Sequence, residues 1–492
     1  MRTESPHPLF LFAIKIKVLY LIFAIVAVIP ASVSCPHGLG LAFAQSDIAL
    51  ENRASRSTEK NAEKTIGKGL EKQLEKRIEK QLSKSIESKG MSSVMKDPEL
   101  RKEAIETIKS ESAASLNPNS SQGKSKSRKH NKATTFHDIT QNKQGFYRLQ
   151  RQWLILTDAS TVNNLERSGF EIIQSTTLKS LGKVLLEIKE PENKTLSQAK
   201  QEKLEIMGNS AIDYNHLFQT QANPKKNPNN AWEPRSALHF KSVSASNNMA
   251  IGIIDTHVEL SHEVFKNANI RQRSFVEKNL NEPNHHGTAI ASMLVGSSKR
   301  YQGLLPNVRL YSASVFYNTP EIKHAASVKS LLLALDWLAQ ENVKIINMSL
   351  AGPKNSLLQY AIERLDKRGI TILAAAGNNG PTAPPVFPAA YQSVVAVTAV
   401  NQKLKAYFKS NRGDYIDVAA PGVNIKHAAP DNQYTTSSGT SFAVPFASAL
   451  AAYIESTASS ENIIGTLINN TKDLGKTGAD EVYGSGLIQV PL

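Results

Sequence analysis

The sequence predicts an α/β protein built on a mostly parallel sheet with helices on both faces. In the C-terminal half, apolar runs rich in β-branched residues read as buried strands, and helix-like segments lie between them. The strand runs are residues 250–254, 308–316, 343–350, 370–376, 394–400 and 416–420, and the helical segments include 328–340 and 356–367. Strands that alternate with helices form parallel sheets, which are buried on both faces. With about 250 residues, this part is large enough for one substantial core.

Two of these elements carry side chains that suit acid and base chemistry. The run 249–254 ends in Asp255, and a buried parallel strand delivers such a residue to the carboxyl edge of its sheet. His286 stands just ahead of Gly287 and a helix of small residues, so we expect its imidazole near that carboxylate. His285 is the rival candidate for the base.

A further element presents a serine at a glycine-flanked turn. Residues 438–445 read SGTSFAVP, so Ser441 is the candidate nucleophile at a helix start. Gly439 lets the backbone pass close to a substrate, and the helix N-terminus offers amide N–H groups where negative charge would develop. An ordinary Ser/Thr N-cap before a buried helix would give a similar string. Asn378, just after the run 370–376, could donate its side-chain amide to an oxyanion.

The order Asp, His, Asn, Ser and the strings around these residues resemble the subtilisin-like serine proteases, the subtilases. The matching strings are DT at 255–256, HGT at 286–288, GN at 377–378 and GTSFAVP at 439–445. The resemblance covers roughly residues 236–492 and implies the subtilisin-like three-layer fold.

The resemblance also implies the roles of the residues. Ser441 would attack a peptide carbonyl, His286 would act as the base, and Asp255 would orient the imidazole. Asn378 and the Ser441 backbone N–H would stabilise the oxyanion. No cofactor is needed for this chemistry. Substrate binding is expected at an edge strand and a pocket wall, formed by Ser349, Leu350, Ala351 and Gly352 and by Ala375, Ala376 and Gly377.

Two positions depart from the family pattern. His257 and Glu263 stand where the family usually has glycine and proline, and neither position carries the chemistry. His257, His262 and His285 are interpreted as loop histidines satisfied by solvent. A metal site is the alternative, although no convergent Asp/Glu/His spacing accompanies them, and calcium binding cannot be read from these loops.

A second, smaller unit is predicted upstream, over residues 146–221. Its runs follow a β-α-β-β-α-β order: strand 152–156, helix 160–167, strands 170–174 and 183–188, helix 196–207 and strand 211–218. The same order and position characterise the subtilase propeptide, so the unit is expected to be a ferredoxin-like prodomain that inhibits its own enzyme. Any ferredoxin-like α+β domain could show this pattern. Residues 222–235 are interpreted as a linker that contains the maturation site.

The N-terminal region differs in composition and charge. Residues 45–145 are rich in Lys, Glu, Ser, Gln and Asn, which indicates a charged low-complexity or helical spacer. Residues 1–145 carry 24 Lys and Arg against 15 Asp and Glu, a larger share of the net charge of +15 than their length alone would give. Residues 45–145 are therefore the segment that would bind an anionic envelope surface, and no specific nucleic acid is expected.

The first 44 residues predict an export signal. Basic residues precede the apolar run 18–29, which is too short for a comfortable membrane span, and the small-residue string Ala42-Phe43-Ala44 follows. We expect cleavage after Ala44 and a periplasmic, cell-envelope or extracellular protein. Cys35, the only cysteine, partly resembles a lipoprotein acylation site but lacks the large aliphatic residue three places earlier.

The sequence therefore predicts an exported subtilisin-like endopeptidase, made as a zymogen, that acts on proteins or peptides. Two other classes stay open. The chain could be a catalytically silent protein that binds peptides along the same edge strand, or an envelope-binding protein that acts through its basic N-terminal region.

Overall fold

The computed structural model describes residues 138–142, 145–167, 170–192, 195–203, 210–220, 223–224, 231–233, 249–457 and 462–490. The predicted signal peptide, nearly all of the predicted spacer and most of the predicted linker lie outside the described residues. Among the residues that are described, no helix combines the length and the apolar character needed to cross a membrane.

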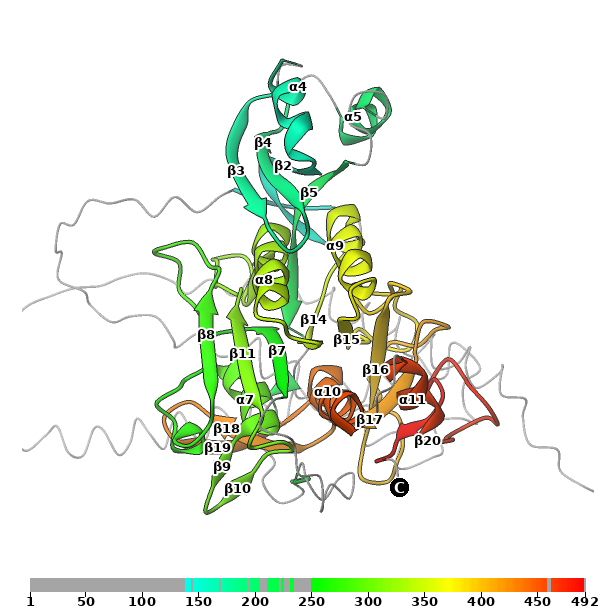
Figure 1. Ribbon diagram of the computed structural model, residues 1–492. Coiled ribbons are helices and arrows are strands. Elements are labelled where there is room, and N and C mark those ends of the chain that lie inside the picture. Colours follow the sequence, from blue (N-terminus) through cyan, green and yellow to red (C-terminus); the bar gives the residue numbers. More distant parts are fainter. Residues whose placement is uncertain are drawn as a thin grey trace, which may run out of the picture. The chain divides into compact units, whose positions relative to one another are not determined.

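A nine-stranded sheet forms the centre of the C-terminal region (Figure 1). Its strand order is β20-β21-β17-β16-β15-β13-β7-β11-β8. The strands are β7 (Ala250–Asp255), β8 (Ile270–Ser274), β11 (Arg309–Ser314), β13 (Ile345–Met348), β15 (Thr371–Ala375), β16 (Val394–Val400), β17 (Val418–Pro421), β20 (Thr471–Lys472) and β21 (Leu487–Ile488). Every neighbouring pair is parallel except β20 with β21. The predicted mostly parallel sheet is therefore confirmed.

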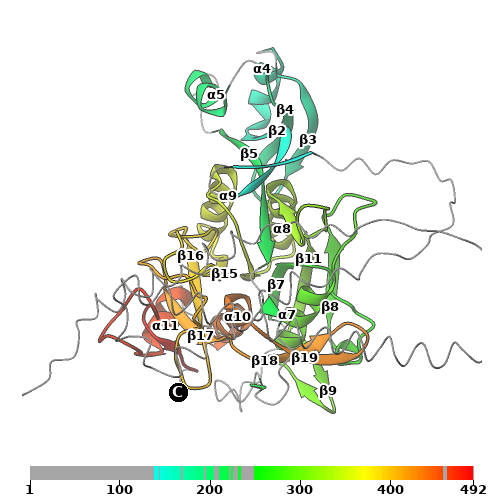
Figure 2. The ribbon, with the colours of Figure 1, turned by 180° about the vertical axis from the view of Figure 1, so that it is seen from behind.

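Helices cover both faces of this sheet (Figures 1 and 2). They are α7 (His285–Val295), α8 (Val328–Gln340), α9 (Ser356–Asp366), α10 (Thr440–Thr457) and α11 (Ile463–Asn469). Helices α7 and α10 pack in one hydrophobic cluster, and α8 and α9 pack in another. Within β15, Leu373 and Ala375 belong to the first cluster, whereas Ile372 and Ala374 belong to the second. Because successive side chains of a strand point to opposite faces, a strand covered on both sides must be apolar throughout.

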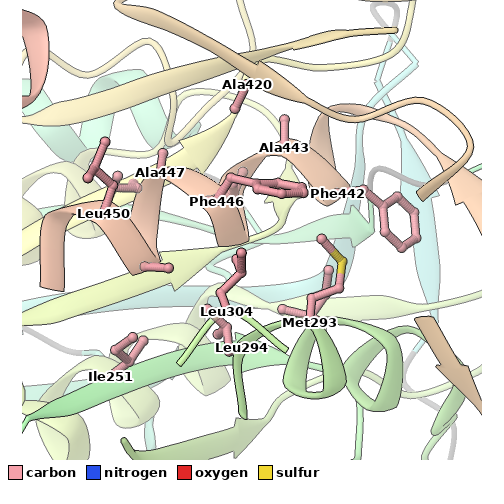
Figure 3. Close-up of a cluster of buried hydrophobic side chains, with 14 of the residues drawn as sticks. Ile251, Met293, Leu294, Leu304, Ala420, Phe442, Ala443, Phe446, Ala447 and Leu450 are labelled. Atoms are coloured by element: carbon pink, nitrogen blue, oxygen red, sulfur yellow. The ribbon is translucent and has the colours of Figure 1, made fainter. Parts of the chain in front are cut away.

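The core beneath α10 fixes the start of this helix. Figure 3 shows Phe442 and Phe446 of α10 lying near Met293 of α7 and Leu304 of the loop that follows it. All four side chains are fully or almost fully buried. Pro445 lies in the second turn of α10, and the Ser441 carbonyl that its missing N–H leaves free accepts the Ser349 hydroxyl at 2.9 Å. The residue before Phe442, Ser441, is therefore held on a rigid, buried helix start.

The smaller upstream unit has the predicted order of elements. They are β2 (Tyr147–Thr157), α4 (Val162–Arg167), β3 (Ile172–Leu178), β4 (Lys183–Lys189), α5 (Leu196–Lys203) and β5 (Ala211–Thr220), with a short 3-10 turn η1 (Ala159–Thr161) before α4. The four strands are antiparallel neighbours in the order β5-β2-β4-β3. One face of this sheet carries a separate apolar cluster that includes Trp153, Ile155, Leu165 and Leu186.

Short strands connect or extend these layers. They are β1 (Ile139–Gln141), β6 (Asn223–Pro224), β9 (Ser297–Ser298), β10 (Tyr301–Gln302), β12 (Ala325–Ser327), β14 (Leu350–Ala351), β18 (Ile425–Ala429) and β19 (Gln433–Ser438), with a 3-10 turn η3 (Glu263–Phe265). β1, β8, β12 and the hairpin of β18 and β19 are absent from the predicted strands. Their residues mix polar and apolar side chains, so they give no long apolar run. The predicted strand 343–350 is divided into β13 and β14 at Ser349.

A half-buried carboxylate makes stability depend on pH. The Asp417 side chain accepts a hydrogen bond from the Ala396 N–H at 2.7 Å. Burial raises the pKa of Asp417 to about 6, above the ordinary value of 3.8. The folded protein therefore binds this proton more tightly than the unfolded chain, so the stability that protonation gives is present at low pH and is lost as the pH rises through about 6.

We expect Asp417→Asn to stabilise the protein at pH 7 by about 1–3 kcal/mol, because asparagine keeps the acceptor but carries no charge. The gain should shrink towards zero at pH 4. Denaturant unfolding at the two pH values, in a Ser441→Ala background that prevents self-digestion, measures it. Asp414→Asn, at an exposed neighbouring carboxylate, is the control. Equal effects of Asp417→Asn at both pH values would contradict this expectation.

Candidate active site

The carboxylate and the imidazole predicted at the sheet edge are in contact. Asp255 ends β7, and His286 lies in the first turn of α7. The Asp255 Oδ1 atom lies 2.7 Å from His286 Nδ1 and also accepts the Thr256 N–H at 2.7 Å. Both side chains are buried. An ionised carboxylate accepts only, so Nδ1 carries the proton and Nε2 is left as the basic nitrogen.

Gly287 makes this contact possible. Its N–H donates to the Thr256 hydroxyl at 2.7 Å, which draws the start of α7 onto the end of β7. A Cβ at this position would collide with the Thr256 carbonyl oxygen. A residue with a side chain would therefore push α7, and His286 with it, away from Asp255.

Ser441 lies at the start of α10 and is fully buried. Its hydroxyl donates to the backbone carbonyl of Ser349 at 3.1 Å, and the Ser349 hydroxyl donates to the Ser441 carbonyl at 2.9 Å. The His286 Nε2 atom has no hydrogen-bond partner within the described part of the chain. The serine-to-histidine bond is thus not formed in this structure, and such bonds often form only when substrate is bound.

Aromatic rings pack around the candidate base. The ring of Phe442, next to Ser441 in the chain, lies edge-on to His286 with centroids 5.7 Å apart. His427 stacks on the other side of Phe442 at 5.2 Å and hydrogen-bonds through Nε2 to the Ser437 hydroxyl at 2.9 Å. Burial lowers the pKa of His427 to about 3, so this ring is neutral and acts as packing. No sequence motif indicated His427, because it lies on an unanticipated strand.

Asn378 lies just beyond β15 and faces the start of α10. Its Oδ1 atom accepts the Thr440 N–H at 3.0 Å and the Thr440 hydroxyl at 3.1 Å. These bonds determine which end of the amide faces Thr440, so the Nδ2 donor points away from it. Gly377, at φ +106°, allows this turn, and a Cβ there would crowd Asn411.

The predicted peptide-binding edge is paired with the smaller unit. β5 lies between β14 and β12 and is antiparallel to both. Thr220 lies opposite Leu350, and Gln219 lies opposite both Ala351 and Ala325. Gly352 packs directly against the buried ring of Phe218 in β5. A strand of this chain therefore occupies the edge at which an extended peptide would pair.

The predicted pocket-wall residues are buried, as are the residues of this edge. Ala375 and Ala376 are fully buried. The Ala376 N–H donates to the Val397 carbonyl, and its own carbonyl accepts the Tyr415 hydroxyl at 2.7 Å. Both backbone groups of Ala376 are satisfied in this way, so neither is free to pair with a peptide strand.

The chain that follows β5 lies next to β19, the strand that leads to Ser441. β6 pairs with β19, with Asn223 opposite Ser438 and Pro224 opposite Ser437. Further on, the Trp232 N–H donates to the Asn424 carbonyl at 2.8 Å, and the Trp232 carbonyl accepts the Lys426 N–H at 3.1 Å. The strand before the predicted linker and described residues within the linker therefore pair with segments that adjoin the candidate nucleophile.

The histidines outside the candidate triad have protein partners. The prediction that solvent satisfies His262 is wrong, because this residue is buried and caps η3 by accepting the Val264 N–H. Its Nε2 atom lies 3.0 Å from the Gln433 carbonyl oxygen. His257 is near Gln272, with Nε2 atoms 3.1 Å apart. In the described residues, no group of three or more His, Cys, Asp or Glu is placed to hold a metal ion.

Comparison with known proteins relates this geometry to one family. Residues 246–486 match the Peptidase S8 subtilase family. The chain is 34% identical over 254 residues to subtilisin DY of Bacillus licheniformis, a match that covers 49% of this chain and 89% of that protein. It is 31% identical over 256 residues to the minor extracellular protease Epr of Bacillus subtilis (strain 168), which covers 51% of this chain but only 39% of Epr.

Solved structures show the same fold. Fervidolysin from Fervidobacterium pennivorans, a keratinolytic enzyme related to subtilisin, aligns with a TM-score of 0.59 at 19% identity over 72% of this chain and 62% of that chain. The epidermin leader peptide processing serine protease of Staphylococcus aureus aligns with a TM-score of 0.54 at 19% identity over 69% of this chain and 97% of that chain. Both alignments extend over more of this chain than the family match does.

Proposed function

The chain belongs to the subtilase family of serine endopeptidases, and from this membership we propose that it is an exported zymogen that cuts peptide bonds through an acyl-enzyme on Ser441. The observation that carries the proposal is the 2.7 Å contact between Asp255 and His286, beside the helix start that holds Ser441. Labelling by a serine-directed fluorophosphonate, present in wild type and absent in Ser441→Ala, tests it. A folded wild-type protein that takes no label after an added protease has removed its smaller unit would instead be the silent peptide-binding alternative.

The proposed reaction begins with the base. His286 Nε2 takes the proton of the Ser441 hydroxyl as the oxygen attacks a peptide carbonyl carbon, and the same nitrogen later protonates the leaving amine. Asp255 keeps the other nitrogen protonated and stabilises the imidazolium that forms. For this step Ser441 must turn its hydroxyl from the Ser349 carbonyl towards Nε2, a rotation about one side-chain bond. Water then hydrolyses the acyl-enzyme by the same route in reverse.

The negative charge of the tetrahedral intermediate would be met by two donors. The Nδ2 group of Asn378 is oriented by its Thr440 contacts, and the Ser441 N–H lies in the first turn of α10, where helix N–H groups have no intrahelical partner. Donors fixed before the reaction need no reorganisation as charge develops, so they favour the transition state over the bound substrate.

The smaller unit is proposed to be the prodomain. Its β-α-β-β-α-β order and its strand order β5-β2-β4-β3 support a ferredoxin-like fold. Its closing strand β5 occupies the peptide-binding edge between β12 and β14, which is the position an inhibitor that imitates substrate would take.

Contacts away from the edge strand support a specific fit between this unit and helices α8 and α9. The Asp336 carboxylate of α8 accepts the backbone N–H groups of Ser180 and Leu181, at 2.7 and 3.1 Å. In the other direction, Asp213 of β5 accepts the N–H of Ser356, the first residue of α9, at 2.9 Å. A carboxylate at a helix N-terminus is favoured by the helix dipole. Each partner thus places a carboxylate on unpaired amides of the other.

We propose that the enzyme cuts its own chain between Gln221 and Ala222. Ser349, whose carbonyl accepts the Ser441 hydroxyl, directly precedes Leu350, the residue opposite Thr220. On the other side, Asn223 is opposite Ser438. Thr220 is thus paired beside Ser349, and Asn223 is paired with the strand that leads to Ser441, so we place the cut between these two described residues.

Wild-type protein should therefore accumulate as a catalytic fragment that begins at Ala222, and Ser441→Ala should stay joined to its prodomain. Intact-mass measurement of both proteins, purified without other proteases, checks this. The segment 146–221, added separately, should also inhibit the processed enzyme. Cleavage of Ser441→Ala at the same bond, or failure of the added segment to inhibit, would rule out the zymogen proposal while leaving proteolysis itself possible.

The export proposal rests on residues 1–44 and on the similarity to Epr, which is an extracellular protease. Envelope binding by residues 45–145 rests on their charge alone. Binding of that segment to anionic vesicles that weakens as salt is added would support it.

A further inference from the structure

A side chain beside the peptide-binding edge makes a polar contact with β5, the strand that occupies this edge. The hydroxyl oxygen of Thr220, the last described residue of β5 before the proposed cut, lies 3.1 Å from the Nδ1 atom of His324. His324 directly precedes β12, which is one of the two strands that enclose β5. A side chain of β5 therefore contacts the residue that leads into the neighbouring strand β12.

A closed loop holds His324 in this position. Tyr317 and Ala325 exchange two backbone hydrogen bonds, each 2.9 Å long, which close the loop that contains His324. Inside it, the Thr319 N–H donates to the Ile322 carbonyl at 2.9 Å, and the Ile322 side chain is buried. The His324 N–H donates to Asn318 Oδ1 at 3.1 Å. The histidine is therefore positioned by its loop and not only by Thr220.

His324 also adopts a backbone conformation that few side chains favour. Its φ angle is +56°, in the left-handed region. Residues other than glycine are uncommon there, although Asn, Asp and His are enriched several-fold. The sequence thus places a histidine at a position where an aliphatic residue would be strained.

The charge state of His324 favours one class of partner. Burial, together with the neighbouring His286, lowers the pKa of His324 below its usual 6.5, while the carboxylate of Asp255 opposes this shift. The ring is therefore neutral at pH 7 and offers one nitrogen as donor and the other as acceptor. A hydroxyl group can serve either nitrogen, whereas a carboxylate can serve only the donor and an aliphatic side chain serves neither.

We propose that His324 selects substrates that carry threonine or serine two places before the bond that is cut. This proposal rests on the proposed function, because the contacted residue precedes Gln221 at the proposed self-cleavage site. A ring nitrogen left without a partner in this partly buried site would penalise substrates that carry an aliphatic side chain there. Valine is the sharpest comparison, since it matches threonine in shape but lacks the hydroxyl.

The test uses full-length protein that has been allowed to process itself. Quenched peptides carry the sequence of residues 217–224, LFQTQANP, with Thr, Ser, Val or Ala at the fourth place. Wild type should cut the Thr peptide with a kcat/KM about 5- to 10-fold above that of the Val peptide, the effect of one hydrogen bond in a partly buried site. In His324→Gly, which suits the positive φ, the Thr to Val ratio should fall to about 1.

Lys323→Ala, an exposed neighbour in the same loop, is the matched control and should keep the wild-type ratio. A ratio near 1 in wild type, or an unchanged ratio in His324→Gly, would overturn the assignment of His324 while leaving peptide hydrolysis intact. The wild-type ratio needs no variant, so a poorly folded His324→Gly would not remove the test. If folded wild type, freed of its prodomain by an added protease, cut none of the peptides, the endopeptidase proposal would fall, and the His324 proposal with it.

Discussion

Replacing Ser441 or His286 by alanine is expected to lower kcat/KM for peptide hydrolysis by on the order of 10⁴- to 10⁶-fold. Without Ser441 there is no oxygen to form the acyl-enzyme, and without His286 nothing removes the proton from that oxygen. The residues of a triad act as a unit, so the double variant should be little worse than either single one. Initial rates on a casein-like substrate, measured on protein freed of its prodomain, check this.

The same substitution at Ser456 provides the control for the serine variant. Ser456 lies at the exposed end of the same helix, and its hydroxyl contacts only the Tyr453 carbonyl among the described residues. Ser456→Ala should keep full activity, and circular dichroism should show that all variants are folded. Substantial hydrolysis by folded Ser441→Ala would contradict the assignment of Ser441 as the nucleophile. Additive losses in the double variant would instead mean that Ser441 and His286 do not act in one step.

Several elements could be predicted closely because their own residues determine them. The strand 394–400 and the helix 328–340 agree with β16 and α8 residue for residue. β16 is buried along its whole length, so its apolar run is unbroken. α8 begins after Ser327, whose hydroxyl accepts the Ser330 N–H, and this N-cap lies in the sequence itself.

Other elements depend on distant partners and leave little trace in the sequence. β8 has only one apolar residue, which is its first. It is a strand because it pairs with β11 at the edge of the sheet. β12 and β14 are two or three residues long and are strands because β5 lies between them. The sequence of such a segment says nothing about which segment will lie beside it.

The candidate site divides in the same way. Asp255 and His286 could be expected to meet, because one ends a buried strand and the other begins a helix with a glycine that permits close approach. The contact of Ser441 with Ser349 could not be expected, because it depends on a side-chain rotation. His324 could not be expected either, since its position comes from a loop closed by Tyr317 and Ala325.

Asn378→Ala is expected to lower kcat by on the order of 10²- to 10³-fold with KM little changed. A donor to the oxyanion makes its strongest bond in the transition state, when the carbonyl oxygen has become negative, so its loss leaves ground-state binding almost intact. Full kinetic curves on a soluble peptide separate the two constants. A loss confined to KM would mean that Asn378 only binds substrate.

Asn378 also anchors the start of α10, so the loss in Asn378→Ala could arise from a displaced Ser441 and not from a missing donor. Thr440→Val separates these causes. Valine removes the hydroxyl that donates to Asn378 Oδ1 and accepts the Gly377 N–H, but keeps the backbone N–H bond and the Nδ2 donor. If donation is what matters, Thr440→Val should lose no more than about 30-fold, the scale of two neutral hydrogen bonds. Equal losses in both variants would instead assign to Asn378 the role of holding the helix start in place, and the oxyanion would then depend mainly on the Ser441 N–H.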